Sequence, residues 1–324
     1  MHHLVLQVPA PTILNADLVA RIAEHAQPGG LEKLPSPQGD WGAQAMRLRD
    51  IGVDPHVVRG FMPALAREHG IDWAVVPAGL RLADFKLLVL DMDSTLVAME
   101  TIDELGAASG KKAQIAAITE AAMRGEIADY AESLRRRLAL LAGTPESVLE
   151  EVYARLRLNP FAEALIAAAR AAGLKVLLAT GGFTWFTERL QQRLGLDFVA
   201  ANTLEMHDGK LTGHALGPIV DAQGKRRALL DACTRIGCAP QQAIAIGDGA
   251  NDLAMMDAAG LSVAYHAKPA VQDAASAALN VCGLDGALWL FEAREGVDEN
   301  NISRVMTRIE SCVGEVSNGQ EGAD

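Results

Sequence analysis

The spacing of hydrophobic and polar positions divides the chain near residue 85. Beyond that point, short continuous apolar runs alternate with segments whose apolar residues recur at helical spacing. Continuous runs are typical of strands buried on both faces, and helices cover such strands. The predicted strands are residues 85–91, 174–180, 243–248, 261–267 and 278–283, and the predicted helices are residues 161–172, 184–195, 225–237 and 251–260. The pattern therefore predicts an α/β, Rossmann-like core with a parallel sheet.

The first 82 residues have a different order of elements, which predicts a small α+β domain. Strands are expected at residues 4–10, 43–51 and 71–78, and helices at residues 15–26 and 54–70. Asn15 is suited to the N-cap of the first helix, and Gly70 is suited to end the second. The stretch 27–42 is rich in proline and glycine, so it predicts turns without a regular element.

An insertion at residues 98–160 interrupts the alternation directly after the first core strand. It is rich in Ala, Leu, Arg and Glu, which predicts helices. A helical insertion in this place would lie above the carboxyl end of the strand, where a lid can close over a ligand. We therefore divide the rest of the chain into a core at 83–97 and 161–295, a helical cap at 98–160, and a C-terminal helix with a disordered tail at 296–324.

Composition narrows the kinds of partner that the chain is expected to have. The formal net charge of −12 disfavours nucleic acid and anionic membranes. The four cysteines lack zinc-site spacing, and the N-terminus lacks the basic and apolar regions of a signal peptide. No apolar run is long enough for a membrane helix. We expect a cytoplasmic protein that acts on a small molecule.

Acidic residues follow two of the predicted strands, in "DMDST" (91–95) and "GDGAND" (247–252). Because ligands bind at the carboxyl ends of parallel strands, these segments should lie close together. Buried carboxylates repel one another, so a cation is the expected compensation. The acids offer only oxygen ligands, which favours Mg²⁺. The candidate acids are Asp91, Asp93, Asp248 and Asp252.

A second set of polar groups suits an anion. Thr180 offers a hydroxyl, and the two glycines after it allow close approach of the backbone to a ligand. Lys225 adds a positive charge at the start of a predicted helix. Acids, a metal, a hydroxyl, amides and a lysine together are typical of a phosphoryl-transfer site.

The segments that carry these residues resemble the motifs of haloacid dehalogenase (HAD)-like hydrolases. "DMDST" resembles the first motif, "ATGG" the second, Lys225 the third and "GDGAND" the fourth, in the same order across residues 85–285. Within that superfamily, "DMDSTLVAMETIDELG" and "GDGANDLAMMDAAGLSVAYHAKP" resemble the phosphoserine phosphatases. The order of elements in the first 82 residues resembles an amino-acid-sensing domain of the ACT type.

The resemblance implies the following chemistry. Asp91 would be the nucleophile that forms an aspartyl-phosphate. Asp93 would protonate the departing oxygen and then accept a proton from the attacking water. Asp91, the main-chain carbonyl of Asp93, and Asp248 would hold Mg²⁺, and Asp252 would support the metal through water.

The resemblance also implies the substrate-binding residues. Asn251 would help to place the substrate. The phosphoryl oxygens would be bound by Thr180, Gly181, Gly182 and Lys225. Thr180 departs from the family, which commonly has serine there; threonine keeps the hydroxyl and adds a methyl group.

Selection of the substrate is expected in the cap. The resemblance implies that Glu100 meets an ammonium group and that Arg137 binds a carboxylate, which a guanidinium can hold with two hydrogen bonds. The residues alone leave Arg135, Arg136 and Arg137 in competition for that role, because an arginine that faces solvent is the usual case.

These implications predict a Mg²⁺-dependent phosphatase that hydrolyses O-phospho-L-serine to L-serine and phosphate, the last step of serine biosynthesis. One alternative is another small phosphomonoester, or phosphoryl transfer to an alcohol such as homoserine, because the catalytic residues would be the same. Another alternative is an amino-acid-sensing regulatory protein with an inactive core, which the complete set of acids and Lys225 disfavours. A homodimer is an open prediction.

Overall fold

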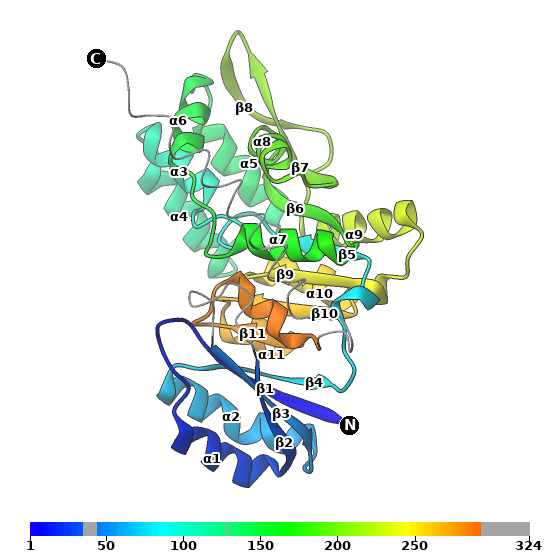
Figure 1. The fold of residues 1–324 in the computed structure, drawn as a ribbon. Helices are drawn as coiled ribbons and strands as arrows, with labels where there is room; N and C mark the ends of the chain where they lie inside the picture. Colours follow the sequence, from blue (N-terminus) through cyan, green and yellow to red (C-terminus); the bar gives the residue numbers. More distant parts are fainter. Residues whose placement is uncertain (35–43, 128, 293–324) are drawn as a thin grey trace, which may run out of the picture. The chain divides into compact units, whose positions relative to one another are not determined.

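The computed structural model describes residues 1–34, 44–127 and 129–292. The chain forms two compact units, one of Met1–Asp84 together with residues from Leu279 onward, and one of Phe85–Ala278 (Figure 1). Residues 279–292 thus group with the N-terminal unit, although the sequence assigned them to the core. The predicted C-terminal helix and tail at 296–324 lie outside the described residues. The division into functional domains stays a prediction.

The N-terminal unit is an antiparallel sheet with two helices on one side (Figure 1). Its strand order is β2-β3-β1-β4. The bounds are β1 (His2–Val8), α1 (Ala16–Ala26), β2 (Pro28–Leu34), β3 (Gln44–Ile51), α2 (Pro55–His69) and β4 (Asp72–Pro77). The side chain of Asn15 accepts hydrogen bonds from the N–H groups of Asp17 and Leu18, and Gly70 ends α2 in the left-handed conformation. Both predicted caps are confirmed.

The prediction of turns without a regular element at 27–42 was wrong for Pro28–Leu34, which forms β2. This strand pairs with β3, from Pro28 opposite Ile51 to Leu34 opposite Ala45. It lies at the edge of the sheet, where proline costs no ladder hydrogen bond. Pairing with a neighbour therefore outweighs the weak strand propensity of the "PGG" sequence.

Buried charged side chains hold residues 280–291 in this unit. Asp72 accepts hydrogen bonds from the N–H groups of Asn280, Val281 and Cys282. Burial raises the pKa of Asp72, while these hydrogen bonds oppose the shift. Arg47 donates to the carbonyls of Trp289 and Phe291.

The second unit contains the predicted parallel sheet, and the α/β fold is confirmed. Its strand order is β10-β9-β5-β6-β7-β8. Every neighbouring pair is parallel except the hairpin of β7 and β8, which turns at Asp208 and Gly209. The bounds are β5 (Leu87–Leu90), β6 (Lys175–Phe183), β7 (Phe198–His207), β8 (Lys210–Leu216), β9 (Ala243–Gly247) and β10 (Leu261–Tyr265), and β11 (Ala277–Leu279) follows.

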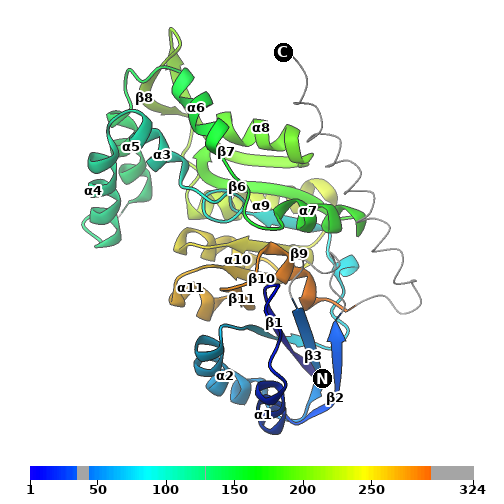
Figure 2. The ribbon, with the colours of Figure 1, turned by 60° about the vertical axis from the view of Figure 1, so that its left-hand side comes forward.

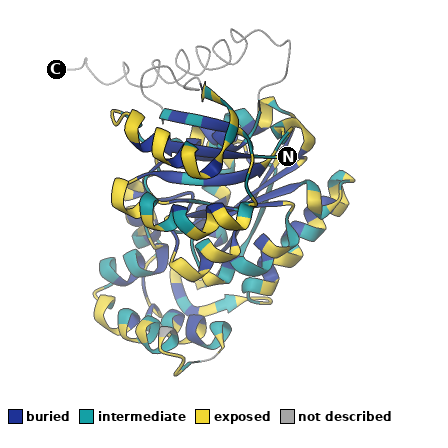
Figure 3. Cartoon of the chain, turned by 90° about the horizontal axis from the view of Figure 1, so that it is seen from below, coloured by how far each residue is buried: buried dark blue, intermediate teal, exposed yellow. Residues whose placement is uncertain are grey.

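Helices cover this sheet, and Figure 3 shows buried residues on the strands and exposed residues on the outer sides of the helices. The helices are α7 (Ala162–Ala171), α8 (Thr184–Leu194), α9 (Ala222–Ile236), α10 (Leu253–Ala258) and α11 (Pro269–Ala274). Leu229 of α9 and Met255 of α10 share one apolar core with Val89 of β5. Among the described residues, no helix is long and apolar enough to cross a bilayer.

Between β5 and α7 the chain folds into helices, which we call the cap (Figure 2). They are α3 (Thr101–Ala108), α4 (Lys112–Met123), α5 (Tyr130–Leu140) and α6 (Ser147–Arg155). The turn between α5 and α6 is joined to the β7–β8 hairpin: the Gly143 N–H donates to the Leu211 carbonyl at 2.8 Å, and the Leu211 N–H to the Thr144 carbonyl at 2.8 Å. The hairpin thus supports the cap from the core.

Candidate active site

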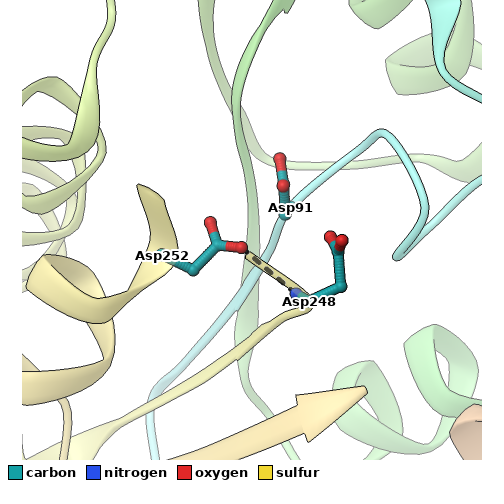
Figure 4. A group of neighbouring side chains, drawn as sticks. All are labelled: Asp91, Asp248 and Asp252. Atoms are coloured by element: carbon teal, nitrogen blue, oxygen red, sulfur yellow. Dashed lines mark hydrogen bonds between the residues drawn. The ribbon is translucent and has the colours of Figure 1, made fainter. Parts of the chain in front are cut away.

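The register of two neighbouring strands places the candidate acids together. β5 and β9 are parallel, with Leu90 opposite Ile246, so Asp91 and Asp248 leave the sheet at the same edge. Asp252 ends the short turn of helix Ala250–Asp252 that follows. One carboxylate oxygen from each of the three residues lies within 4.8 Å of the others. We call Asp91, Asp248 and Asp252 the acidic cluster (Figure 4).

Lys225 compensates part of the charge of this cluster. Its side chain is fully buried, and its Nζ lies 2.7 Å from Asp91 Oδ1 and 2.7 Å from Asp252 Oδ1. Burial lowers the pKa of Lys225, but the two carboxylates outweigh burial and raise it above its ordinary value. The ammonium is therefore a permanent charge at neutral pH. Asp252 also accepts the N–H groups of Asp248 and Gly249 at 3.2 Å and 3.1 Å.

The protein raises the pKa of three carboxyl groups in the site, those of Asp91, Asp248 and Asp93. Burial, with Asp252 adding to it, raises the pKa of Asp91 well above its ordinary value, and Lys225 opposes the shift. Burial and then Asp252 raise the pKa of Asp248 to about 6, opposed by a 3.0 Å hydrogen bond from the Thr95 hydroxyl. Burial and then Glu100 raise the pKa of Asp93 to about 7. Asp93 can thus hold or release a proton near neutrality.

The acidic cluster fits a divalent cation. With all three carboxylates ionised, the cluster and the ammonium of Lys225 would leave two negative charges, which one divalent ion would neutralise. All the donors are oxygens, and two of the three residues are buried. Hard cations prefer such a donor set. The carboxylate of Asp93 is outside this group, and it accepts the N–H of Thr101 at 3.0 Å and the Thr101 hydroxyl at 3.3 Å.

The turn after β5 is held in an unusual backbone conformation. Ser94 has a φ of 57°, which few residues other than glycine adopt. Asn159 donates its side-chain amide to the carbonyls of Ser94 and Thr95, at 3.3 Å and 2.8 Å. These bonds hold the turn that directly follows Asp93.

Residues Thr180–Gly182, which we call the glycine loop, lie where β6 departs from regular pairing. The register with β7 shifts between Ala179 and Phe183. The Thr180 hydroxyl accepts the Gly182 N–H at 2.8 Å. A Cβ atom on Gly182 would lie 2.6 Å from Met92 Cε and 3.1 Å from Asp93 Oδ2. Only glycine therefore lets this loop approach the turn that carries Asp93.

The structure separates the three competing arginines of α5. Arg136 is exposed and donates to Glu132 at 2.7 Å, and Arg135 lies 3.8 Å from the same carboxylate. Arg137 is half-buried, and its charge acts on Glu100 and on Tyr130. Within the described part of the chain, Arg137 has no carboxylate within 4.0 Å. Of the three arginines, Arg137 is thus the one whose charge acts on Glu100 without a paired carboxylate among the described residues.

Glu100 lies directly before α3, at the entrance to the cap. Its carboxylate accepts the Ser94 hydroxyl at 2.6 Å. Although part of its surface is exposed, the surrounding protein raises the pKa of Glu100, and the hydrogen bond from Ser94 opposes that shift. Arg137 also lowers the pKa of Glu100, so the two predicted recognition residues act on each other.

Comparison with known proteins shows the family of the chain. Residues 88–257, more than half of the chain, match the haloacid dehalogenase-like hydrolases. The chain belongs to the HAD-like hydrolase family. It is 56% identical over 223 residues to a phosphoserine phosphatase of Polaromonas sp., which covers 67% of this chain and 94% of that protein.

The matches to two further proteins cover more of this HAD-like chain. A phosphoserine phosphatase of Streptomyces coelicolor is 47% identical over 287 residues, which are 89% of this chain and 69% of the relative. The solved structure of a HAD family hydrolase from Salmonella enterica covers 90% of this chain and 99% of its own, with a TM-score of 0.81 and 31% identity. The match to the HAD fold predicted from the motifs is confirmed.

Several polar residues of the HAD-like site were not found from the sequence. They are Thr95, Thr101, Tyr130, Asn159 and Asn202. Each one acts through a hydrogen bond to a partner distant in the sequence or in another element, apart from the contact of Thr101 with Asp93. Only Thr95 carried a signal, as the last residue of "DMDST". Asn251, which was predicted to place the substrate, lies beside Asp252 and is partly buried.

Proposed function

We propose that the chain is a phosphoserine phosphatase that hydrolyses O-phospho-L-serine to L-serine and phosphate, the last step of serine biosynthesis. The observation that carries the proposal is the arrangement of Asp91, bonded to Lys225 inside the acidic cluster, below a cap that presents Glu100 and Arg137. The printed names of the relatives from Polaromonas and Streptomyces support the choice of substrate.

In the first step, Asp91 attacks the phosphorus atom and the bond from phosphorus to the serine oxygen breaks. Asp93 supplies the proton to that oxygen. A pKa of about 7 suits this role, because Asp93 can be protonated before the step and ionised after it. The products of the step are serine and an aspartyl-phosphate on Asp91.

In the second step, water attacks the phosphorus of the aspartyl-phosphate, and the bond to Asp91 breaks. Asp93, now ionised, accepts the proton of the water. Without substrate, Lys225 Nζ lies 2.7 Å from Asp91 Oδ1. Its positive charge would offset negative charge on the phosphoryl group in both steps. The glycine loop and Asn251 would hold the phosphoryl oxygens and the substrate in place; the Gly182 N–H would exchange its bond to Thr180 for one to the phosphoryl group.

Asp91, Asp248 and the main-chain carbonyl of Asp93 would hold Mg²⁺, with Asp252 in support through water. Bound there, Mg²⁺ would lower the pKa of Asp91 and offset the charge of the phosphoryl oxygens. The acidic cluster has the oxygen donors that such an ion needs, and both its occupation and the choice of Mg²⁺ belong to the proposal.

Selectivity would come from the two charged groups of serine. Glu100 would bind the ammonium group, and Arg137 the carboxylate. Both residues belong to the cap region, so closure of the cap would complete the site and exclude bulk water. Location in the cytoplasm and assembly as a homodimer stay predictions.

The test is release of phosphate from phosphoserine with Mg²⁺, after removal of metal with EDTA, and with added homoserine. We expect turnover with Mg²⁺ and none with EDTA. Full turnover without metal would overturn the role of the acidic cluster. Phosphohomoserine as the main product would favour the transferase alternative, and absence of any turnover the regulatory one. A structure with beryllium fluoride should place the fluoride complex on Asp91.

A further inference from the structure

The carbonyl oxygen of Gly181 is a point where the core and the cap meet. It accepts the side-chain amide of Asn202 at 2.8 Å and the hydroxyl of Tyr130 at 3.4 Å. Asn202 belongs to core strand β7, and Tyr130 is the first residue of cap helix α5. A carbonyl oxygen has two lone pairs, so these two donors use its acceptor capacity.

On the core side of this junction, Asn202 makes two hydrogen bonds to different segments. Asn202 is buried, and its Oδ1 accepts the N–H of Val220 at 2.8 Å. Val220 precedes Asp221, the N-cap of the helix that carries Lys225. One amide group therefore ties the glycine loop to the segment that positions Lys225, and the Gly181 carbonyl has a fixed place for the cap to meet.

The cap side of the junction is the start of helix α5, which also carries Arg137. The side chain of Asp129 accepts the Ala131 N–H at 2.9 Å, so α5 begins at Tyr130. Arg137 lies seven residues further along, on the same face of the helix. Where Tyr130 is fixed against the core, the position of Arg137 is therefore restricted as well.

The hydroxyl of Tyr130 is close to the loop and to the charges of the site. A Cβ atom on Gly181 would overlap this hydroxyl, so glycine is needed there for the contact. Burial raises the pKa of Tyr130, opposed first by Arg137 and then by Lys225. The hydroxyl consequently stays protonated at neutral pH and remains a donor.

We propose that Tyr130 is a positioning residue that fastens cap helix α5 to the glycine loop through the Gly181 carbonyl. The bond favours the closed position of the cap, in which Arg137 reaches the carboxylate of the substrate. The inference rests on the proposed function, because that function assigns the carboxylate to Arg137 and the phosphoryl group to the glycine loop.

The first test compares Tyr130→Phe with the wild type and with Tyr153→Phe. Tyr153 is a matched control: it lies in cap helix α6, its ring packs edge-on against Trp185 at 6.1 Å, and its hydroxyl has no hydrogen-bond partner among the described residues. For Tyr130→Phe, KM for phosphoserine should rise about three- to tenfold, the effect of one hydrogen bond, while kcat stays within about twofold. Tyr153→Phe should match the wild type, and melting temperatures should agree among all three.

Two kinetic outcomes would overturn the proposal. An unchanged KM in Tyr130→Phe would mean that the hydroxyl does not fasten the cap. A lower kcat at unchanged KM would mean that the hydroxyl acts on the reacting atoms, which makes it a catalytic residue and not a positioning residue.

The second test does not depend on the substrate. Amide hydrogen exchange of α5 should be faster in Tyr130→Phe than in the wild type, while exchange of α9 should be the same in both. Equal exchange of α5 in the two proteins would overturn the proposal. If the wild type does not hydrolyse phosphoserine, the proposed function fails, and the exchange comparison still decides whether Tyr130 fastens the cap.

Discussion

The acidic cluster of the core and the side chains proposed for recognition, Glu100 and Arg137, are held in different ways. In the core, Lys225 is fully buried and lies 2.7 Å from each of two carboxylates. In the cap region, Glu100 is exposed and accepts one hydrogen bond from Ser94. Among the described residues, the one hydrogen bond of the Arg137 side chain goes to the carbonyl of Ser133 at 3.4 Å. Fixed charges in a buried site need no reorganisation during the reaction, whereas partly exposed side chains can adjust to a ligand. Under the proposed function, the core would be organised for chemistry before the substrate arrives, and the cap would complete recognition afterwards.

The largest effect should come from the nucleophile on the core side of this comparison. Asp91→Asn should lower turnover about 10⁴-fold or more, because a neutral amide is a poor nucleophile. The measurement is phosphate release from phosphoserine. Asp231→Asn, an exposed position on α9, is the control and should keep full activity. Turnover of Asp91→Asn close to that of the wild type would remove the assignment.

The next effect concerns the buried ammonium. Lys225→Met should lower kcat about 10²- to 10³-fold, since it removes a fixed charge from the phosphoryl site. The free energy of unfolding should also fall, by about 3 kcal/mol or more, because Asp91 and Asp252 lose their buried partner. Urea denaturation in EDTA measures the free energy of unfolding. Arg226→Met changes the exposed neighbour and should leave both quantities unchanged. An equal loss in Arg226→Met would contradict a specific role of Lys225, because any positive charge near the start of α9 would then have the same effect.

A smaller and more selective effect is expected in the cap. Arg137→Ala should lower kcat/KM for phosphoserine about 10- to 100-fold, the worth of a bidentate charged contact. The loss for phosphoethanolamine, which has no carboxylate, should be slight. Arg136→Ala is the control, because Arg136 is exposed and paired with Glu132. Equal losses with the two substrates would contradict recognition of a carboxylate by Arg137.

The smallest expected effect is a shift in pH dependence that links the two regions. Glu100 is a cause of the raised pKa of Asp93, after burial. Activity that needs protonated Asp93 falls as pH rises through this pKa. Glu100→Gln removes a neighbouring negative charge, so it should lower the pKa of Asp93 and move the alkaline limb of kcat/KM to lower pH. Glu120→Gln, on the exposed side of the cap, should leave the limb in place. A shift of the alkaline limb to higher pH in Glu100→Gln would contradict the conclusion that Glu100 raises the pKa of Asp93.

The core was largely predictable from the sequence because its signals are local. Continuous apolar runs identified β5, β6, β9 and β10. The residues that support the site were not predictable in this way. Asn202 and Asn159 look like ordinary polar residues in the sequence, and their importance lies in hydrogen bonds to Gly181, Val220 and Thr95.

In the N-terminal unit, edge strand β2 is a second element that depends on a partner elsewhere in the sequence. Its sequence favours turns, and only pairing with β3 makes it a strand. Propensity is a weak guide where a neighbouring strand supplies the hydrogen bonds.

The sequence by itself determined which residue types could perform phosphoryl transfer, since the acids, the glycines and Lys225 occur in a fixed order along the chain. Only the tertiary structure decided which of three consecutive arginines has a charge that acts on Glu100, and that Tyr130 meets the glycine loop. The physical reason is that charge and hydrogen bonding depend on distances between segments remote in the chain, which a linear pattern does not contain.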